Sequence, residues 1–190
     1  MKKTILSLAL MAAVANVQAA EKELNENKNC HQGLLDYIEA RIRSEEAAAM
    51  KHADGVIAPD FTLKDLKGKP LSLKSLRGKY VILDFWGSWC GWCIKGIPQM
   101  KEYYKKYSGK FEILGIDCND TDQKWRDAVK KYQLPWLHVY NPRDSKVLKD
   151  YGVQGFPTKI IVGPDGKIVK TIIGEDPAFY TFLDKLFGKK

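Results

Sequence analysis

Cysteine and histidine are both scarce in this 190-residue chain, which contains four cysteines and three histidines. A zinc site built from these residues needs about four ligands, usually in closely spaced pairs. The chain has a Cys-x-x-Cys sequence at Cys90 and Cys93, but no second such pair and no His-x-x-x-His sequence to complete a zinc site. Zinc binding is therefore disfavoured, and we expect no metal and no cofactor apart from a redox-active disulfide.

Long apolar runs are also missing, because no stretch reaches the roughly 20 residues that a transmembrane helix needs. The apolar stretch over residues 5–17 follows Lys2 and Lys3 and precedes small residues ending at Ala19. A positive start, a short apolar stretch and small residues at a cleavage position are typical of a secretory signal peptide. We therefore expect residues 1–19 to be removed by cleavage after Ala19, and the mature protein to be exported to the periplasm.

The basic residues are not gathered on any one segment. The formal net charge is +8, and it falls to +6 when Lys2 and Lys3 are removed with the signal peptide. A nucleic-acid partner would require a dense basic stripe with interleaved aromatic residues, which the sequence lacks. The charge pattern therefore favours a basic surface and no nucleic-acid partner. We expect a monomer, although the charge pattern does not bear on the oligomeric state.

Two regions of different composition follow the signal peptide. Residues 20–54 are charged and alanine-rich, and Leu34, Ile38 and Ile42 recur at every fourth position. This spacing predicts an N-terminal extension containing an amphipathic helix. Residues 55–190 alternate between apolar runs and helical patterns, and are expected to form one domain.

The pattern of this domain predicts an α/β fold. Alternating residues predict a hairpin over residues 61–73. Apolar runs predict strands at 80–86, 111–116, 136–140, 158–162 and 167–173, and helical patterns predict helices at 90–107, 122–132, 145–151 and 177–187. Strands alternating with helices imply parallel pairing through right-handed crossovers, so we expect a central mixed sheet flanked by helices.

Cys90 and Cys93 lie where the strand over residues 80–86 gives way to a helix. At a helix N-terminus, free N–H groups and the positive end of the dipole stabilise a thiolate, and can lower a cysteine pKa from about 8.5 into the range of roughly 3.5–7.5. Cys90, at the exposed helix start, is therefore the expected nucleophile. Cys93 lies one turn further on the same helix face, where it can close a disulfide and resolve a mixed disulfide with a substrate.

Three segments together carry a resemblance to a known family: Asp84-Phe85-Trp86-Gly87-Ser88-Trp89-Cys90-Gly91-Trp92-Cys93, then Pro98 inside the helix, then Gly155-Phe156-Pro157-Thr158. They resemble the thioredoxin superfamily, and within it the exported TlpA-like and ResA-like thiol-disulfide oxidoreductases. The similarity covers roughly residues 58–187. It implies a thioredoxin-like fold and exchange of disulfides with protein thiols, in the reducing direction, with electrons supplied by a membrane redox partner.

The resemblance also implies roles for residues outside the cysteine pair. Pro157 matches the cis-proline that lies against the pair and leaves the backbone of Phe156 free to bind an extended substrate. Asp84 matches a buried carboxylate beneath the pair, whose pKa burial should raise, so that it can take a proton from Cys93. Trp89 is expected in the rim of the site.

The expected substrate-binding residues are those around the pair: Trp89, Gly91, Trp92, Phe156 and Pro157. Two positions depart from the family pattern. Gly96 stands where cytochrome-maturation members carry a glutamate, so a dedicated role in preparing cytochrome c cysteines is not implied. Trp92 stands where proline is common before the second cysteine.

The remaining cysteines, Cys30 and Cys118, lie outside the motif. In an exported protein they could form a disulfide between the extension and the domain, or remain two free thiols, and the sequence leaves both open. His138, within an expected strand, is interpreted as an ordinary core or edge histidine.

Two other functions were weighed against disulfide exchange. Peroxiredoxins share the fold, but place a single peroxidatic cysteine after a proline-threonine pattern that is absent here. Sco-like copper carriers normally separate their cysteines by three residues and add a histidine, whereas two residues separate Cys90 from Cys93. Both patterns fit the sequence less well than a thiol-disulfide oxidoreductase.

Overall fold

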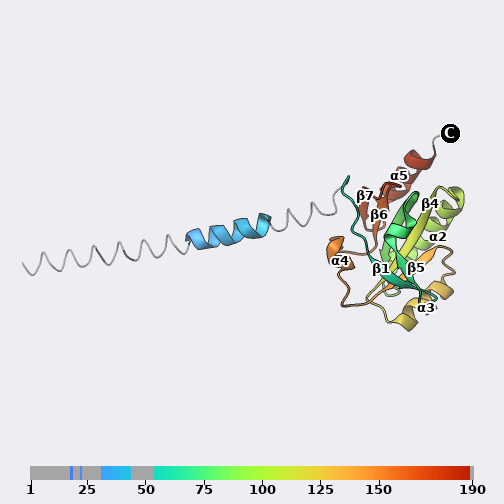
Figure 1. Cartoon of the computed structure of the whole chain (residues 1–190), viewed down its shortest axis with the longest axis horizontal. Helices are drawn as coiled ribbons and strands as arrows, with labels where there is room; N and C mark the ends of the chain where they lie inside the picture. Colours follow the sequence, from blue (N-terminus) through green and yellow to red (C-terminus); the bar gives the residue numbers. More distant parts are fainter. Residues whose placement is uncertain (1–17, 19–21, 23–30, 44–53, 189–190) are drawn as a thin grey trace, which may run out of the picture. The chain divides into compact units, whose positions relative to one another are not determined.

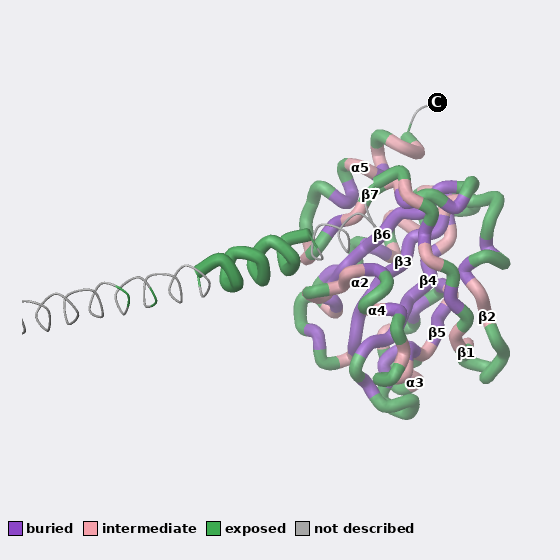
Figure 2. The backbone as a smooth tube through the Cα atoms, turned by 60° about the vertical axis from the view of Figure 1, so that its left-hand side comes forward, coloured by how far each residue is buried: buried purple, intermediate pink, exposed green. Residues whose placement is uncertain are grey.

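The computed structural model describes residues 18, 22, 31–43 and 54–188. The chain divides into two units, residues 1–47 and 48–190. In the first unit, residues 31–43 are helical, as the spacing of Leu34, Ile38 and Ile42 predicts, and these three side chains are exposed (Figure 2). The predicted cleavage site at Ala19 lies outside the described residues. Among the helices that are described, none is long and apolar enough to span a bilayer.

The second unit is built on a seven-stranded sheet with the strand order β2-β1-β5-β4-β3-β6-β7. Figure 1 shows this sheet together with the helices of the unit. The strands are β1 (Thr62–Asp65), β2 (Pro70–Ser72), β3 (Tyr80–Trp86), β4 (Phe111–Cys118), β5 (Leu137–Asn141), β6 (Thr158–Val162) and β7 (Ile168–Ile173). The helices are η1 (Leu73–Leu76), α2 (Gly91–Lys106), α3 (Asp122–Lys131), α4 (Val147–Asp150) and α5 (Pro177–Phe187). The predicted α/β class and mixed sheet are confirmed.

The strand pairs are partly parallel and partly antiparallel. β3, β4 and β5 are parallel, as expected for strands joined by helices, while β6 pairs antiparallel with β3 and with β7. β1 and β2 form the predicted antiparallel hairpin. β5 begins one residue later than predicted, because Leu137 is the residue that pairs with Leu114 of β4.

The sheet is covered on both faces, and its central strands are almost entirely buried (Figure 2). On one face, residues of α2, α3 and α5 pack on alternate residues of the strands, including Ile82 and Trp86 of β3. We call this the disulfide face, because Cys90 and Cys93 belong to the same cluster. On the opposite face, Val81, Leu83 and other strand residues pack against η1 and α4.

Candidate active site

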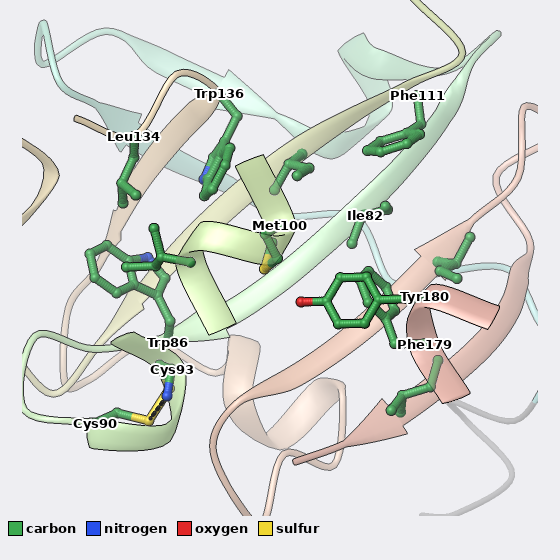
Figure 3. Packing of buried hydrophobic residues seen from close by; sticks show 14 of the residues in the cluster. Ile82, Trp86, Cys90, Cys93, Met100, Phe111, Leu134, Trp136, Phe179 and Tyr180 are labelled. Atoms are coloured by element: carbon green, nitrogen blue, oxygen red, sulfur yellow. Dashed lines mark hydrogen bonds between the residues drawn. A yellow bond between two sulfur atoms is a disulfide. The ribbon is translucent and has the colours of Figure 1, made fainter. Parts of the chain in front are cut away.

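The two motif cysteines form a disulfide at the N-terminus of α2. The S–S distance is 2.01 Å and the Cα atoms are 5.3 Å apart. Cys90 is the N-cap residue of α2, and its Sγ accepts a hydrogen bond from the backbone N–H of Cys93 at 3.1 Å, as Figure 3 shows. The first turn of α2 contains no acidic residue to oppose a negative charge. Free backbone N–H groups and the positive end of the helix dipole are found at such a position, and both favour a negatively charged group.

The two cysteines do not differ in their exposure to solvent. Cys90 is 5% exposed and Cys93 is 6% exposed in the disulfide form, so the expectation that Cys90 lies at an exposed helix start is wrong for this state. The reason is the packing around the helix start, where both sulfur atoms join the core cluster beside Trp86 (Figure 3). The capping hydrogen bond, rather than exposure, distinguishes Cys90 from Cys93.

Two tryptophans flank the disulfide and are largely exposed. Trp89 is 52% exposed and Trp92 is 62% exposed, which is unusual for the largest apolar side chains. The Trp89 ring packs edge-on against Phe156 at 5.3 Å between centroids, and its Nε1 donates a hydrogen bond to the carbonyl oxygen of Cys118 at 2.9 Å. These contacts bring the start of β6 next to the disulfide loop.

The other residues expected to contact substrate also lie in this region. Gly91 opens α2 and is exposed, with open space where a side chain would stand. The Phe156–Pro157 peptide bond is cis, as the resemblance implies, and Pro157 is buried directly before β6. The predicted substrate-binding residues Trp89 and Phe156 are thus in direct contact, while Trp92 and Gly91 lie within the disulfide loop.

Asp120 holds the segment before the cysteines, a role that sequence reasoning missed. Its carboxylate accepts hydrogen bonds from the Ser88 backbone N–H at 2.6 Å and from the Ser88 hydroxyl at 2.7 Å. Burial, together with a hydrogen bond and repulsion from Asp120, raises the pKa of neighbouring Asp117 to about 9. Asp117 is therefore neutral at physiological pH, and Asp120 is the residue that accepts both hydrogen bonds from Ser88.

Asp84 is buried on the disulfide face. Side chains alternate along a strand, so Asp84 points to the same side of β3 as Ile82 and Trp86, which pack in the cluster that contains both cysteines. Its side chain is removed from solvent, and Oδ1 has no hydrogen-bond partner among the described residues. Burial raises the pKa of Asp84 to about 6, partly offset by Lys159 and reinforced by Glu175. The predicted burial and raised pKa are confirmed.

Lys159 and Glu175 form a buried ion pair on the same face, which sequence reasoning also missed. Lys159 Nζ lies 2.7 Å from Glu175 Oε2, and the two side chains are only 2% and 13% exposed. Lys159 is the antiparallel partner of Asp84 in the pairing of β6 with β3. The sequence carried a signal, since Lys159 is the one charged residue in a strand that is otherwise predicted to be buried on both faces.

The backbone on both sides of Glu175 is fixed. Gly174 adopts a left-handed conformation with φ of 86°, and its N–H donates to the carbonyl oxygen of Pro157 at 2.7 Å. Asp176 caps α5 by accepting from the Ala178 N–H at 2.8 Å. Glu175 therefore enters the disulfide face from a tightly held turn between β7 and α5.

Gly96 of α2 lies against the Glu175 carboxylate. A Cβ atom at Gly96 would overlap that carboxylate, so the absence of a side chain is what admits Glu175. Gly96 stands where cytochrome-maturation members of the family carry a glutamate. In this protein a carboxylate lies beside that position, but it belongs to Glu175, in the turn before α5.

His138 and Cys118 are both buried. Burial lowers the pKa of His138 to about 4, so it is neutral, in agreement with its interpretation as a core histidine. Cys118 is a free thiol with no exposed surface, and burial strongly raises its pKa. Of the two alternatives, the structure has Cys118 as a free thiol, while its possible partner Cys30 lies outside the described residues.

The described part of the chain holds no group of three or more His, Cys, Asp or Glu side chains placed to bind a metal ion. Both cysteines of the motif are joined to each other, whereas a peroxidatic cysteine acts singly. The arrangement suits reversible opening of the Cys90–Cys93 disulfide by exchange with other thiols.

The sheet order, the flanking helices and a Cys-x-x-Cys disulfide at the start of α2 define a thioredoxin-like thiol-disulfide oxidoreductase. Residues 55–171 match the model of the AhpC/TSA family, and the chain belongs to this family.

Relatives and solved structures agree with this class. ResA, a thiol-disulfide oxidoreductase of Bacillus anthracis, is 43% identical over 122 residues, which cover 64% of this chain and 70% of ResA. The crystal structure of the thioredoxin domain of a thiol-disulfide oxidoreductase from Bacteroides vulgatus has a TM-score of 0.66 at 34% identity, and covers 71% of this chain and 98% of that one. A thiol:disulfide interchange protein from Bacteroides sp. gives the same TM-score of 0.66 and identity of 34%, over 73% of this chain and 93% of that chain. This chain is an enzyme of the same class.

Proposed function

We propose that this thiol-disulfide oxidoreductase reduces disulfides of protein substrates outside the cytosol, with Cys90 as the nucleophile and Cys93 as the resolving cysteine. The observation that carries this proposal is the position of Cys90 as the N-cap of α2, beside the exposed rings of Trp89 and Trp92. The helix N-terminus favours a thiolate on Cys90, and the exposed rings offer an apolar surface for a substrate.

In the first step, the Cys90 thiolate attacks one sulfur of the substrate disulfide. Its electron pair forms a Cys90–substrate disulfide, and the second substrate sulfur leaves as a thiolate that takes a proton from water. The expected contacts of the extended substrate are with Trp89, Trp92 and Gly91, and with the backbone at Phe156 and Pro157.

In the second step, the Cys93 thiol gives its proton to the Asp84 carboxylate. The Cys93 thiolate attacks the Cys90 sulfur, the mixed disulfide breaks, and the remaining substrate sulfur leaves as a thiolate. The substrate has then gained two electrons, and Cys90 and Cys93 have lost them to become a disulfide. A dithiol donor must restore the reduced enzyme, and for an exported protein we propose a membrane redox partner.

The proposed location rests on the sequence of residues 1–19. We propose that they are a signal peptide, that the mature periplasmic protein begins at residue 20, and that it is a monomer. Mass spectrometry of protein recovered from the periplasm, combined with light scattering, tests all three points. A mass that retains residues 1–19, or a scattering mass twice that of one chain, would contradict the corresponding point.

The direction of exchange is tested by the redox potential of the Cys90–Cys93 pair together with insulin reduction. Equilibration with glutathione buffers gives the potential, and turbidity with dithiothreitol as donor follows insulin reduction. We expect a potential more negative than that of the glutathione couple and rapid insulin reduction. A potential far above the glutathione couple, with no insulin reduction, would assign the enzyme to the oxidising direction instead.

A further inference from the structure

One ammonium group lies between two carboxyl groups on the disulfide face. Lys159 of β6 and Asp84 of β3 are direct partners in an antiparallel pair, and directly opposed side chains lie on the same face of a sheet with Cβ atoms about 4.5–5.5 Å apart. Glu175 reaches the same ammonium from the turn before α5. Both acids can therefore compete for Lys159.

In the structure, Lys159 pairs with Glu175 and not with Asp84. Lys159 Nζ is 2.7 Å from Glu175 Oε2, whereas Asp84 Oδ1 is buried without a hydrogen-bond partner among the residues described. Tyr180 of α5 holds the other oxygen, because its hydroxyl donates to Glu175 Oε1 at 2.8 Å. Gly96 leaves the space that the carboxylate fills. Three separate elements thus fix Glu175 on Lys159.

We propose that Glu175 is a positioning residue for the resolving step: by binding Lys159, it keeps the ammonium from pairing with Asp84, which stays a base strong enough to take the Cys93 proton. The inference rests on the proposed role of Asp84. A carboxylate paired directly with an ammonium is a weaker base, and a weaker base removes a thiol proton more slowly.

The electrostatics of Asp84 agree with this arrangement. Lys159 lowers the pKa of Asp84 and Glu175 raises it, while burial makes the largest contribution. Other titratable groups on this face include Tyr180 on α5, Asp117 on β4, His138 on β5 and, on α2, the cysteine pair with Tyr103 and Tyr104, whose pKa values are both raised. Tyr180, Asp117 and His138 are neutral near pH 7, because burial raises the pKa of the first two and lowers that of His138. Lys159 and Glu175 are thus the charged groups that, together with burial, determine the pKa of Asp84.

The two members of the pair should have opposite effects. Glu175→Gln keeps the shape of the side chain but frees the ammonium, so Asp84 should titrate at lower pH. Lys159→Met removes the ammonium, so Asp84 should titrate at higher pH. We expect a change of about one pKa value, or tenfold in the proton affinity, in each case. The double variant Lys159→Met/Glu175→Gln removes both charges and should return toward the wild-type value.

The pKa of Asp84 is measured from its carboxyl carbon by NMR titration of the oxidised protein. In parallel, the rate of release of a model thiol from a preformed Cys90 mixed disulfide is followed against pH. Its acidic limb should move in the same direction as the NMR value, to lower pH in Glu175→Gln and higher pH in Lys159→Met. Asp165→Asn is a matched control, because Asp165 forms an exposed ion pair with Lys167 at 3.8 Å, in the turn between β6 and β7, and its loss should move neither quantity.

The outcomes separate this inference from the role proposed for Asp84. Shifts in the same direction for both single variants, or no shift in either, would overturn the positioning role of Glu175. If Asp84→Asn leaves the release rate unchanged at every pH, the proton-acceptor role of Asp84 fails first, whatever the Glu175 variants show. Opposite shifts that cancel in the double variant support the inference, since a purely structural role for the pair would not give them.

Discussion

On the disulfide face, the carboxylate of Glu175, in the turn before α5, lies directly against Gly96 of α2. A Cβ atom at residue 96 would occupy the place of the Glu175 carboxylate. In most helix interiors, Gly→Ala stabilises by roughly 0.5–1 kcal/mol. Here we expect Gly96→Ala to destabilise the protein instead, by about 1–3 kcal/mol, because the methyl group overpacks the site and displaces a buried carboxylate. Guanidinium unfolding measures the change, and a more stable Gly96→Ala variant would contradict the close contact.

Asp84 should make stability depend on pH in a defined window. Its pKa is about 6 in the folded protein, against an ordinary value of 3.8, so folding is favoured when the carboxyl group is protonated. The contribution of protonated Asp84 to the free energy of unfolding is fully present below about pH 4. It is lost as pH rises through about pH 6, which lowers the free energy of unfolding by roughly 3 kcal/mol. Asp84→Asn carries no charge, so its stability relative to the wild type should rise by about this amount between pH 4 and pH 8.

Guanidinium unfolding of both oxidised proteins at these two pH values gives that difference. Below pH 4, the stability difference between Asp84→Asn and the wild type should no longer depend on pH. A difference that is constant from pH 4 to pH 8 would show that Asp84 has the same pKa in the folded and unfolded states.

The proton-acceptor role of Asp84 predicts a kinetic effect that is separate from stability. Asparagine nearly preserves the shape of the side chain but accepts no proton, so Asp84→Asn should slow the resolving step near neutral pH. General-base catalysis contributes typically 10²- to 10⁴-fold, and we expect a loss toward the lower end of this range. The rate should recover as pH rises and Cys93 ionises without help. Stopped-flow release of a thiol from Cys90 measures it, and equal rates for both proteins from pH 6 to pH 9 would leave Asp84 a structural residue.

Cys118 should be unreactive while the protein is folded. It has no exposed surface, and burial raises its pKa far above the usual range, so almost no thiolate is present at pH 8. In a Cys30→Ala variant with the Cys90–Cys93 disulfide intact, we expect no thiol to react with an aromatic disulfide reagent until denaturant is added. One thiol should then react. Rapid reaction of the folded variant would show that the thiol is accessible from solvent.

Much of the fold could be predicted because its signals are local. The strand predicted from the apolar run over residues 80–86 agrees with β3, and the two strands predicted on either side of the turn at residues 163–166 agree with β6 and β7 at nearly every residue. The cysteine pair could be placed because it lies where a predicted strand gives way to a predicted helix. Asp84 and its burial were expected from the family resemblance, which implies a buried carboxylate beneath the pair.

The missed residues depend on contacts between distant elements. Lys159 opposes Asp84 only because β6 pairs with β3 in one particular register, and a shift of one residue would turn Lys159 to the other face. Glu175 reaches Lys159 only because α2 carries a glycine at residue 96. The burial of Cys90 likewise arises from tertiary packing around the start of α2, and the periodicity of the sequence does not indicate such packing.

The central claim, that Cys90 attacks and Cys93 resolves, is tested most directly by trapping with variants that lack one cysteine of the pair. Cys93→Ala and Cys90→Ala, each combined with Cys30→Ala, are incubated with a peptide disulfide at pH 6, and the covalent adducts are mapped by mass spectrometry. We predict that the protein with Cys93→Ala accumulates a mixed disulfide through Cys90, because the helix N-terminus favours the Cys90 thiolate, the resolving thiol is absent and the remaining Cys118 is buried. Cys90→Ala should form at least tenfold less adduct. Equal trapping by both variants, or preferential trapping through Cys93, would contradict the assignment.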